Sequence, residues 1–354
     1  MRVPRRIRLA IVGFGTVGRW LAEAVQRRRR WLEGSCGLEV ALVAVATRRD
    51  GFVHREGGLD VPTLLALSSS GRPLAEHPGA RRWASALEGL AATETDVLAE
   101  ASNTDPRQPE PALSHIRQAL ARGAHVITSS KGACAASAVE LLALARARGA
   151  QLRMESTVMS GTPVLSTIRE GLAGARVTSL RGILNATANA ILTAMADGLD
   201  YGSALAAAQA RGYAEPDPAN DVEGHDSVAK ARILAAIAYG ATVGLDQVFR
   251  RGIAGMSSRE VLEATRAGAR VKLVVTIMPV APHAGTAGSA PTEIRVEPVA
   301  LPLADPLARV DGVMNALAIQ TDTVDEVIVL GPGAGPAQAG QGMFADLAAL
   351  CRSW

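Results

Sequence analysis

Apolar runs and amphipathic stretches alternate along the first 150 residues of the chain. The runs carry few polar residues, as strands buried on both faces of a parallel sheet do, and they cover residues 7–12, 38–46, 95–101 and 125–128. Apolar positions with helical spacing fill 16–30 and 111–122 between them. This alternation predicts a parallel α/β domain. Residues 51–80 are rich in Gly, Pro and Ser and predict irregular structure.

The pattern changes after about residue 151. Ala-rich amphipathic helices and extended segments follow, the helices near 187–197, 202–211 and 226–239 and the extended segments at 177–184 and within 292–322. A buried-type strand at 326–330, a glycine-rich turn and a last helix then follow, and we expect them to fold back onto the first domain. The predicted domains are therefore 1–150 with 320–354, and 151–319. Residues 279–291 predict a loose loop.

Composition narrows the class of protein. The chain has 354 residues with a net charge of +3, and about 150 residues per domain suggests two domains. The small, scattered excess of arginine and the scarcity of aromatic residues do not indicate a nucleic-acid partner. No run of about 18 apolar residues predicts a membrane span, and no signal peptide is recognisable, so we expect a cytoplasmic protein. Three cysteines cannot make a disulfide framework.

The first apolar run leads directly into a glycine turn that opens a helix, made of Gly13, Phe14, Gly15, Thr16, Val17 and Gly18. After a strand, such glycines allow a tight turn, close approach of a pyrophosphate and close packing of helix on strand. The N-terminus of the helix then faces the phosphates. The pattern therefore predicts dinucleotide binding in a Rossmann-type domain, and a purely structural turn is the alternative.

The end of the second strand bears on which dinucleotide is bound. NAD sites usually place Asp or Glu there to bond the ribose hydroxyl groups. Here the strand ends Ala46–Thr47–Arg48–Arg49, with no carboxylate before Asp50. Because guanidinium groups bind phosphate well, Arg48 and Arg49 predict a 2′-phosphate and therefore NADP, with NAD as the alternative cofactor. The other interpretation is a pair of exposed loop arginines without a ligand.

Lysine is rare in this chain, since only three of its 37 basic residues are lysine: Lys131, Lys230 and Lys272. A desolvated lysine can lose its proton and act as an acid or base, whereas arginine stays protonated. The three lysines are therefore candidate functional residues. The alternative is that they survived a general bias towards arginine.

Five carboxylates lie within residues 215–226, in a segment that contains two prolines and is flanked by Ala-rich helices. Asp226 and Lys230 are four residues apart, so they share one face of the helix that begins there. A solvated loop with an ordinary ion pair is one explanation. The other is a site in which carboxylates bind an ammonium group and a lysine is presented to an oxygen atom.

This acidic segment resembles the signature of homoserine dehydrogenase, the NAD(P)-dependent enzyme that interconverts homoserine and aspartate 4-semialdehyde. Further motifs match in the family's order and together span nearly the whole chain: residues 13–18, 125–132, 155–163, 181–185, 212–230 and 331–335. The acidic segment with its lysine is specific to the family, whereas the glycine turns are not. The resemblance implies an NADP-dependent oxidoreductase of threonine and methionine biosynthesis.

The resemblance also implies roles for individual residues. It assigns the catalytic roles to Lys230 as acid/base, Lys131 as its electrostatic partner and Asp226 beside them. It assigns substrate binding to Glu215, Asp221, Tyr213 and Thr187, and cofactor binding to the glycine turn with Lys131 and Gly335. A monovalent cation, usually sodium, is implied at Glu155 and the main-chain oxygens of Val158, Ser160 and Thr162.

The resemblance also implies an α/β fold: a Rossmann-type domain and an α+β substrate domain whose mixed sheet forms a homodimer. We expect the short monofunctional form, with neither an aspartokinase nor an ACT domain. Ala186, Ala190 and Ser130 depart from the family's usual residues, and Ala186 stands where a glycine borders the pocket. If that position needs a positive φ, alanine is strained there. These departures leave two alternatives: an enzyme acting on another amino or hydroxy aldehyde, or a silent NADP-binding paralogue.

Overall fold

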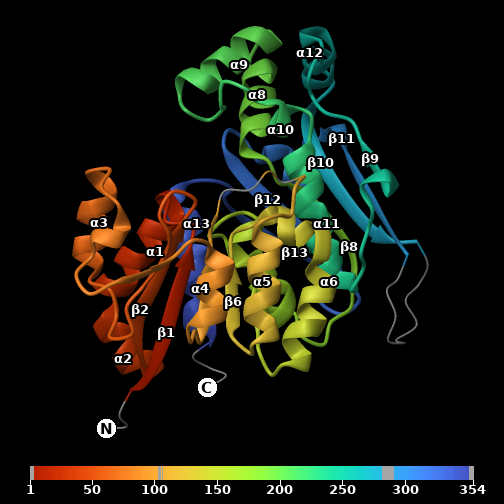
Figure 1. The fold of residues 1–354 in the computed structure, drawn as a ribbon. Coiled ribbons are helices and arrows are strands. Elements are labelled where there is room, and N and C mark those ends of the chain that lie inside the picture. Colours follow the sequence, from red (N-terminus) through yellow and green to blue (C-terminus); the bar gives the residue numbers. More distant parts are fainter. Residues whose placement is uncertain (1–3, 103–104, 106, 281–290, 351–354) are drawn as a thin grey trace. The chain divides into compact units, whose positions relative to one another are not determined.

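A seven-stranded sheet organises the first of two units in the computed structural model (Figure 1). The structure describes residues 4–102, 105, 107–280 and 291–350. Unit 1 comprises residues 1–161 and 335–354, and unit 2 comprises residues 162–334. Among the described residues, no helix has the length and apolar character needed to cross a membrane.

The sheet of unit 1 has the strand order β4-β3-β2-β1-β5-β6-β7. Its strands are β1 (Arg5–Val12), β2 (Leu38–Thr47), β3 (Gly51–His54), β4 (Arg81–Trp83), β5 (Val97–Glu100), β6 (His125–Thr128) and β7 (Leu152–Arg153). The strands β2, β1, β5, β6 and β7 run parallel, as predicted, whereas β3 pairs antiparallel with both of its neighbours. The parallel strands therefore end together at one edge of the sheet, where the glycine turn follows β1.

Helices connect these strands: α1 (Thr16–Arg27), α2 (Arg29–Cys36), α3 (Val61–Ser69), α4 (Ala86–Ala92), α5 (Ala112–Ala121), α6 (Lys131–Ala147) and α13 (Pro336–Leu350), with the short turns η1 (Leu74–Glu76) and η2 (Glu155–Thr157). Polar caps begin two of them, because Asp60 accepts from the backbone of α3 and Ser85 from that of α4. The region 51–80 is thus more regular than we predicted. Its strand is too short, and its helix too uniformly apolar, to show a clear period.

Unit 2 is built on a six-stranded mixed sheet with the order β13-β12-β8-β10-β11-β9. Its strands are β8 (Val177–Ile183), β9 (Val248–Arg250), β10 (Ala269–Pro279), β11 (Thr292–Pro302), β12 (Met314–Thr321) and β13 (Glu326–Pro332). Its helices are α7 (Val164–Ser166), α8 (Ala186–Ala196), α9 (Tyr201–Ala210), α10 (Ala219–Val222), α11 (His225–Tyr239) and α12 (Ser258–Arg266), with the turns η3 (Thr167–Gly171), η4 (Leu245–Gln247) and η5 (Pro306–Arg309). The β11–β9 pair is parallel and the other pairs are antiparallel.

The return to unit 1 comes later in the chain than we predicted. We expected residues 320–354 to join the first domain, but β13 pairs along its whole length with β12 in the second sheet. Only the segment from residue 335 returns, and α13 then packs beside α1 (Figure 1). The difference arises because β12, which comes just before β13 in the chain, is its antiparallel partner and holds it in the second sheet. Most of the predicted loop at 279–291 lies outside the described residues, between β10 and β11.

Candidate active site

Each of the three glycines in the turn after β1 suits its position for a different structural reason. Gly13 has φ of +95°, and a Cβ there would lie 2.3 Å from the backbone of Ala101. A Cβ on Gly18 would lie 2.1 Å from the carbonyl oxygen of Gly13, so only glycine lets α1 pack this closely on the turn. Gly15 has nothing within 4 Å of its would-be Cβ, which leaves open space where α1 begins. This is the arrangement that the backbone approach of a pyrophosphate requires.

The start of α1 offers backbone donors to an anion. Its N-cap is Gly15, whose missing side chain supplies no cap to the first turn, and that turn contains no acidic residue. The unsatisfied N–H groups and the positive end of the helix dipole therefore favour phosphate. The other predicted glycine, Gly335, has φ of +128° just before α13 begins. The residues of the turn thus fit a dinucleotide.

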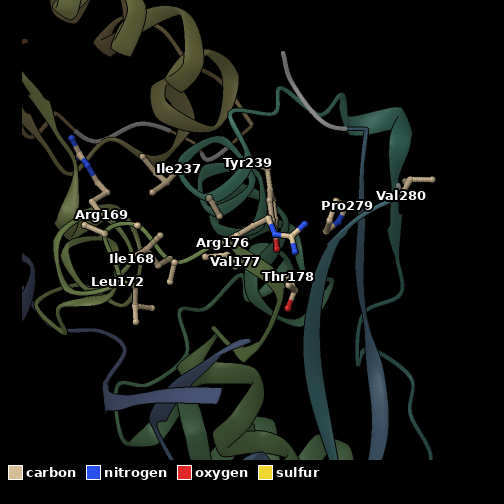
Figure 2. A pocket seen from close by; sticks show the side chains of 14 residues that line it. Ile168, Arg169, Leu172, Arg176, Val177, Thr178, Ile237, Tyr239, Pro279 and Val280 are labelled. Atoms are coloured by element: carbon tan, nitrogen blue, oxygen red, sulfur yellow. The ribbon is translucent and has the colours of Figure 1, made fainter. Parts of the chain in front are cut away.

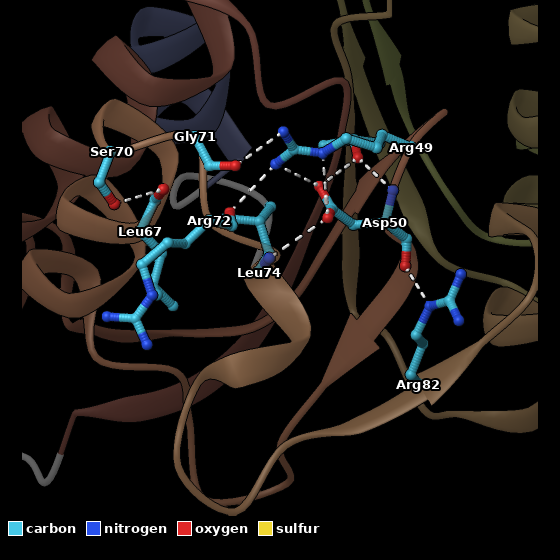
Figure 3. A network of polar contacts seen from close by, with 9 residues as sticks. Arg49, Asp50, Leu67, Ser70, Gly71, Arg72, Leu74 and Arg82 are labelled. Carbon is cyan, nitrogen blue, oxygen red and sulfur yellow. Dashed lines mark hydrogen bonds and ion pairs between the residues drawn. The ribbon is translucent and has the colours of Figure 1, made fainter.

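The two arginines that we predicted to bind a 2′-phosphate differ in their contacts, and Figure 3 shows those of Arg49. Arg49 donates to the carbonyl oxygens of Gly71 (3.1 Å) and Arg72 (3.0 Å) and contacts the Asp50 carboxylate. Arg48 is exposed. Arg49 thus ties the turn to the segment that follows α3, and its guanidinium is already engaged by protein acceptors.

The Asp50 carboxylate is committed to its own turn. It is buried, with a side chain 4% exposed. It accepts from the Thr47 hydroxyl at 2.7 Å and from the backbone N–H of Leu74 at 3.3 Å. A carboxylate held in this way does not face ribose hydroxyl groups. This supports the sequence argument that the first acid after β2 is not an NAD-type ribose ligand.

Lys131 is the first residue of α6, directly after β6, and its side chain is half-buried. The backbone leading to it is held by buried polar contacts, since the N–H of Ser130 donates to the Thr128 hydroxyl at 2.9 Å and that hydroxyl donates to the carbonyl oxygen of Glu100. Lys131 therefore stands at the carboxyl edge of the parallel strands in unit 1, where ligands of such sheets bind.

In unit 2, one amide gathers two of the predicted carboxylates. The Asn185 side chain donates to Asp221 Oδ1 at 2.7 Å and to Asp226 Oδ2 at 3.0 Å. Its own oxygen accepts from the backbone N–H of Ala188 and caps α8. Asn185 therefore joins the start of α8 to α10 and α11, and its amide holds the two carboxylates near each other.

Lys230 completes this group. Its Nζ lies 2.7 Å from Asp226 Oδ2 and donates to the carbonyl oxygen of Leu184 at 2.5 Å. Both side chains of the ion pair are only 7% exposed. The predicted i,i+4 pair is therefore present, and it is buried rather than a solvated surface pair. Burial and these two oxygen contacts fix the direction of the Lys230 ammonium group. A lysine on the surface has no such fixed direction, because its side chain is flexible.

The other predicted substrate residues surround this group more loosely. The Thr187 hydroxyl donates to the carbonyl oxygen of Tyr213 at 2.6 Å, which fixes the segment before the acidic cluster. Tyr213 is 44% exposed. Glu215 is exposed, and its carbonyl oxygen accepts from the Gln209 side chain at 3.1 Å.

Ala186 causes no backbone strain. It is the first residue of α8, and among the described residues the non-glycine positions with positive φ are Met159, Ser160 and Asp325. The expectation of strain at this position is therefore wrong, because a helical φ accepts alanine as readily as glycine. At position 186 the departure from the family is therefore one added methyl group, without a change of backbone conformation.

The predicted cation segment has an unusual backbone. Met159 and Ser160 both adopt left-handed φ values, 55° and 56°, which cost about 1–2 kcal/mol per residue. Glu155 is buried, and its N–H donates to Asp346 of α13 at 2.8 Å. Two successive residues with left-handed φ change the direction of their carbonyl groups relative to an ordinary turn. Carbonyl oxygens that point towards one place can act as ligands of a cation. Among the described residues, no group of three His, Cys, Asp or Glu side chains is placed to hold a metal.

The cavity in Figure 2 lies at the C-terminal end of α11, where Ile237 and Tyr239 line it. Its volume is about 690 Å³, and Ile168, Leu172, Val177 and Ile237 supply apolar walls. None of the predicted site residues lines this cavity.

Cys134 follows Lys131 by three residues in α6. It is not a reactive group, because burial raises the pKa of its thiol to about 12.

Sequence reasoning missed two residues of unit 2. Asn185 was visible only as part of a motif, yet its position before an Ala-rich helix is the usual signal for an N-cap. Lys272 was a candidate only through the scarcity of lysine. It is 1% exposed in β10, and its contacts come from segments far apart in the sequence, which no local pattern reveals.

Comparison with known proteins gives the family. A family model described as homoserine dehydrogenase matches residues 163–348, and one described as homoserine dehydrogenase, NAD binding domain matches residues 13–155. An NAD(+)-dependent homoserine dehydrogenase of Pseudomonas canavaninivorans is 37% identical over 340 residues, which are 96% of this chain and 95% of that protein. A homoserine dehydrogenase of Methanocaldococcus jannaschii is 31% identical over 96% of this chain and 97% of its own.

Solved structures of homoserine dehydrogenases also resemble this chain. The homoserine dehydrogenase of Thiobacillus denitrificans matches with a TM-score of 0.82 and 30% identity, over 98% of this chain and 74% of its own. A hyperthermophilic archaeal homoserine dehydrogenase in complex with NADPH matches with a TM-score of 0.80 and 29% identity, over 99% of both chains. The chain therefore belongs to the homoserine dehydrogenase family of NAD(P)-dependent oxidoreductases.

Proposed function

We propose that Lys230 is the acid/base of this homoserine dehydrogenase and that Asp226 orients it. A nicotinamide cofactor held at the glycine turn would supply the hydride chemistry, which connects homoserine with the aldehyde in either direction. The lysine ammonium donates a proton to the carbonyl oxygen as negative charge develops there, and the amine takes it back in the oxidative direction. The buried ion pair at 2.7 Å is the observation that carries this assignment. Lys131 supplies a second cation for the substrate.

The acidic cluster then serves the rest of the substrate. Homoserine is an amino acid, so its ammonium group needs anionic partners. Asp221 is held by Asn185 and only half-buried, which leaves it able to accept from a ligand. Glu215 adds a second carboxylate, and the Thr187–Tyr213 contact keeps the segment that carries it in place. Together these residues favour an amino aldehyde over a neutral aldehyde.

We propose NADP as the preferred cofactor, with Arg48 as the residue that binds the 2′-phosphate. Asp50 is sequestered and Arg49 is engaged by backbone carbonyl groups, so Arg48 is the better ligand of the two. The relative from Pseudomonas canavaninivorans is described as NAD(+)-dependent, so the preference needs a direct test.

Replacing Arg48 by Ala should raise the KM for NADP⁺ about 10–100-fold and leave the KM for NAD⁺ within about twofold. A charge-assisted hydrogen bond to phosphate contributes about 1.5–3 kcal/mol, and each 1.4 kcal/mol is tenfold. Initial rates with both cofactors measure this change. Arg55→Ala, on the loop after β3, is the matched control and should leave both constants unchanged. Equal changes for NADP⁺ and NAD⁺ in the Arg48 variant would refute the assignment.

A sodium ion is proposed at Glu155 and the carbonyl oxygens of Val158, Ser160 and Thr162, where it would hold the strained backbone of this segment. Sodium chloride should then raise the melting temperature above that in tetramethylammonium chloride of equal ionic strength, because a ligand of the folded state stabilises it. Glu155→Gln should abolish the difference, whereas the surface variant Glu140→Gln should keep it. The same response to sodium in all three proteins would contradict the site.

A homodimer is proposed through one face of the unit 2 sheet. Cross-strand register places Ile328 and Leu330 on one face, opposite Ala318 and Ala316, and these two large side chains are 38% and 57% exposed. Burying such a patch is the usual basis of a stable dimer. Leu330→Arg should convert a dimer to a monomer in light scattering, whereas Leu199→Arg, at another exposed leucine, should not. A monomeric wild type would exclude this interface.

A further inference from the structure

Polar residues follow one side of α8 at four-residue intervals: Asn185, Asn189 and Thr193. Residues at this spacing lie one above the other on a helix. Asn185 contacts the carboxylates of the candidate site, as described above. Asn189 is 1% exposed, and its amide donates to the carbonyl oxygens of Val310 (2.9 Å) and Met314 (3.0 Å). The Thr193 hydroxyl accepts from the N–H of Gly312 at 3.1 Å.

Lys272 of β10 lies at the centre of this polar side. Its Nζ donates to Asn189 Oδ1 at 3.1 Å, to the carbonyl oxygen of Val310 at 2.6 Å and to Asp311 Oδ1 at 2.8 Å. An ammonium group has three N–H bonds, so three acceptors satisfy it fully. The ion is 1% exposed, whereas the Asp311 side chain is 55% exposed, so much of its countercharge lies in solvent.

Burial of this lysine opposes its charge. Desolvation lowers the pKa of Lys272, and the hydrogen bond to Asp311 partly offsets that effect. A methionine or leucine in the same place would avoid the desolvation, and buried ion pairs are often no more stabilising than apolar residues of similar size. The lysine must therefore be explained by something other than stability, such as a specific geometry.

The composition of α8 explains what that geometry is for. Five of its eleven residues are alanine, which are small and pack without strong directionality. Alanines project little from a helix and so interlock weakly with neighbouring elements, whereas hydrogen bonds are lost when heavy atoms separate beyond about 3.5 Å. The polar side therefore determines the axial position of α8, and the Asn185 amide moves with it.

We propose that Lys272 is a positioning residue for homoserine, holding α8 where the Asn185 amide meets Asp221 and Asp226. The inference rests on the proposed role of the acidic cluster in substrate binding. Lys272 acts through α8, with Asn189 as the intermediate contact one helical turn from Asn185. The third lysine of the chain is thereby explained without a role in proton transfer.

Lys272→Met tests this proposal, because it puts an unbranched apolar side chain of similar volume in place of the lysine and removes all three donors. We expect the KM for homoserine to rise about tenfold, the equivalent of one lost hydrogen bond at the site. The dissociation constant of NADPH, measured by its fluorescence, should stay within about twofold. Asn189→Asp provides a second, isosteric variant: it keeps an acceptor for Lys272 but removes the donors to Val310 and Met314. It should raise the same KM.

Leu301→Ala is the matched control, since it removes a 3% exposed side chain from β11 and destabilises the core of unit 2 while keeping every hydrogen-bonding group of the polar side. It should lower the melting temperature and leave the KM for homoserine unchanged. The proposal is overturned if both polar variants keep a normal KM, or if they change it only as much as Leu301→Ala does. Asp221→Asn separates the two hypotheses: a normal KM in that variant would reject the substrate role of the cluster itself.

Discussion

Lys230→Met should reduce turnover by about 10²–10⁴-fold, the usual contribution of a positioned acid/base. Methionine keeps the volume of the side chain but donates no proton to the substrate oxygen. Steady-state rates in both directions measure the loss. NADPH binding should be unchanged, because the glycine turn that provides for it belongs to unit 1. A variant with near-normal turnover would show that the assignment to Lys230 is wrong.

Stability must be measured beside this rate. Removing Lys230 leaves Asp226 buried without its cation, which costs about 3–5 kcal/mol. The double variant Lys230→Met/Asp226→Asn removes that unpaired charge and should recover stability but not turnover. Arg232→Met, two residues further along α11, is the matched control: its guanidinium donates to the carbonyl oxygen of Val243, and we expect normal turnover.

Asp221→Asn should raise the KM for homoserine about 10–100-fold with a smaller effect on kcat. The amide keeps the shape of the side chain, but it loses the negative charge that an ammonium group would meet, and such charge-assisted bonds contribute about 1.5–3 kcal/mol. Initial rates over a range of homoserine concentrations give both constants.

Asp217→Asn is the control for this change. Asp217 lies in the same acidic segment, and its carboxylate accepts from the N–H of Ala219 at 3.1 Å. Loss of one negative charge from the segment is common to both variants, so a general electrostatic effect would raise the KM equally. A normal KM in the Asp217 variant and a raised KM in the Asp221 variant is the expected result; equal values would count against a specific contact.

Local signals in the sequence were sufficient for much of this molecule. The strand at 125–128 could be predicted from its apolar run, and the helices near 187–197, 202–211 and 226–239 from the local spacing of their apolar residues. The i,i+4 relation of Asp226 and Lys230 likewise follows from helix geometry alone. Their burial does not, because it depends on Leu184 and Asn185, more than forty residues earlier in the chain.

Long-range pairing accounts for what was mispredicted. The strand at 326–330 followed by glycine and helix has the appearance of a unit that returns to the first domain. Its antiparallel partner β12 holds it in unit 2 instead. Arg48 and Arg49 are equivalent in the sequence, and only the carbonyl groups of Gly71 and Arg72 distinguish them. Lys272 is the extreme case, since its three acceptors come from two distant segments.

The most direct test of the account is a steady-state assay of the purified protein with L-homoserine, using NADP⁺ and then NAD⁺ and following the absorbance of the reduced nicotinamide. The account predicts homoserine-dependent reduction with a higher kcat/KM for NADP⁺. Other amino alcohols and diols, tested as substrates in the same assay, should have a lower kcat/KM than homoserine. Tight NADPH binding without homoserine-dependent turnover, or a clear preference for another substrate, would contradict the assignment of Lys230 and the acidic cluster.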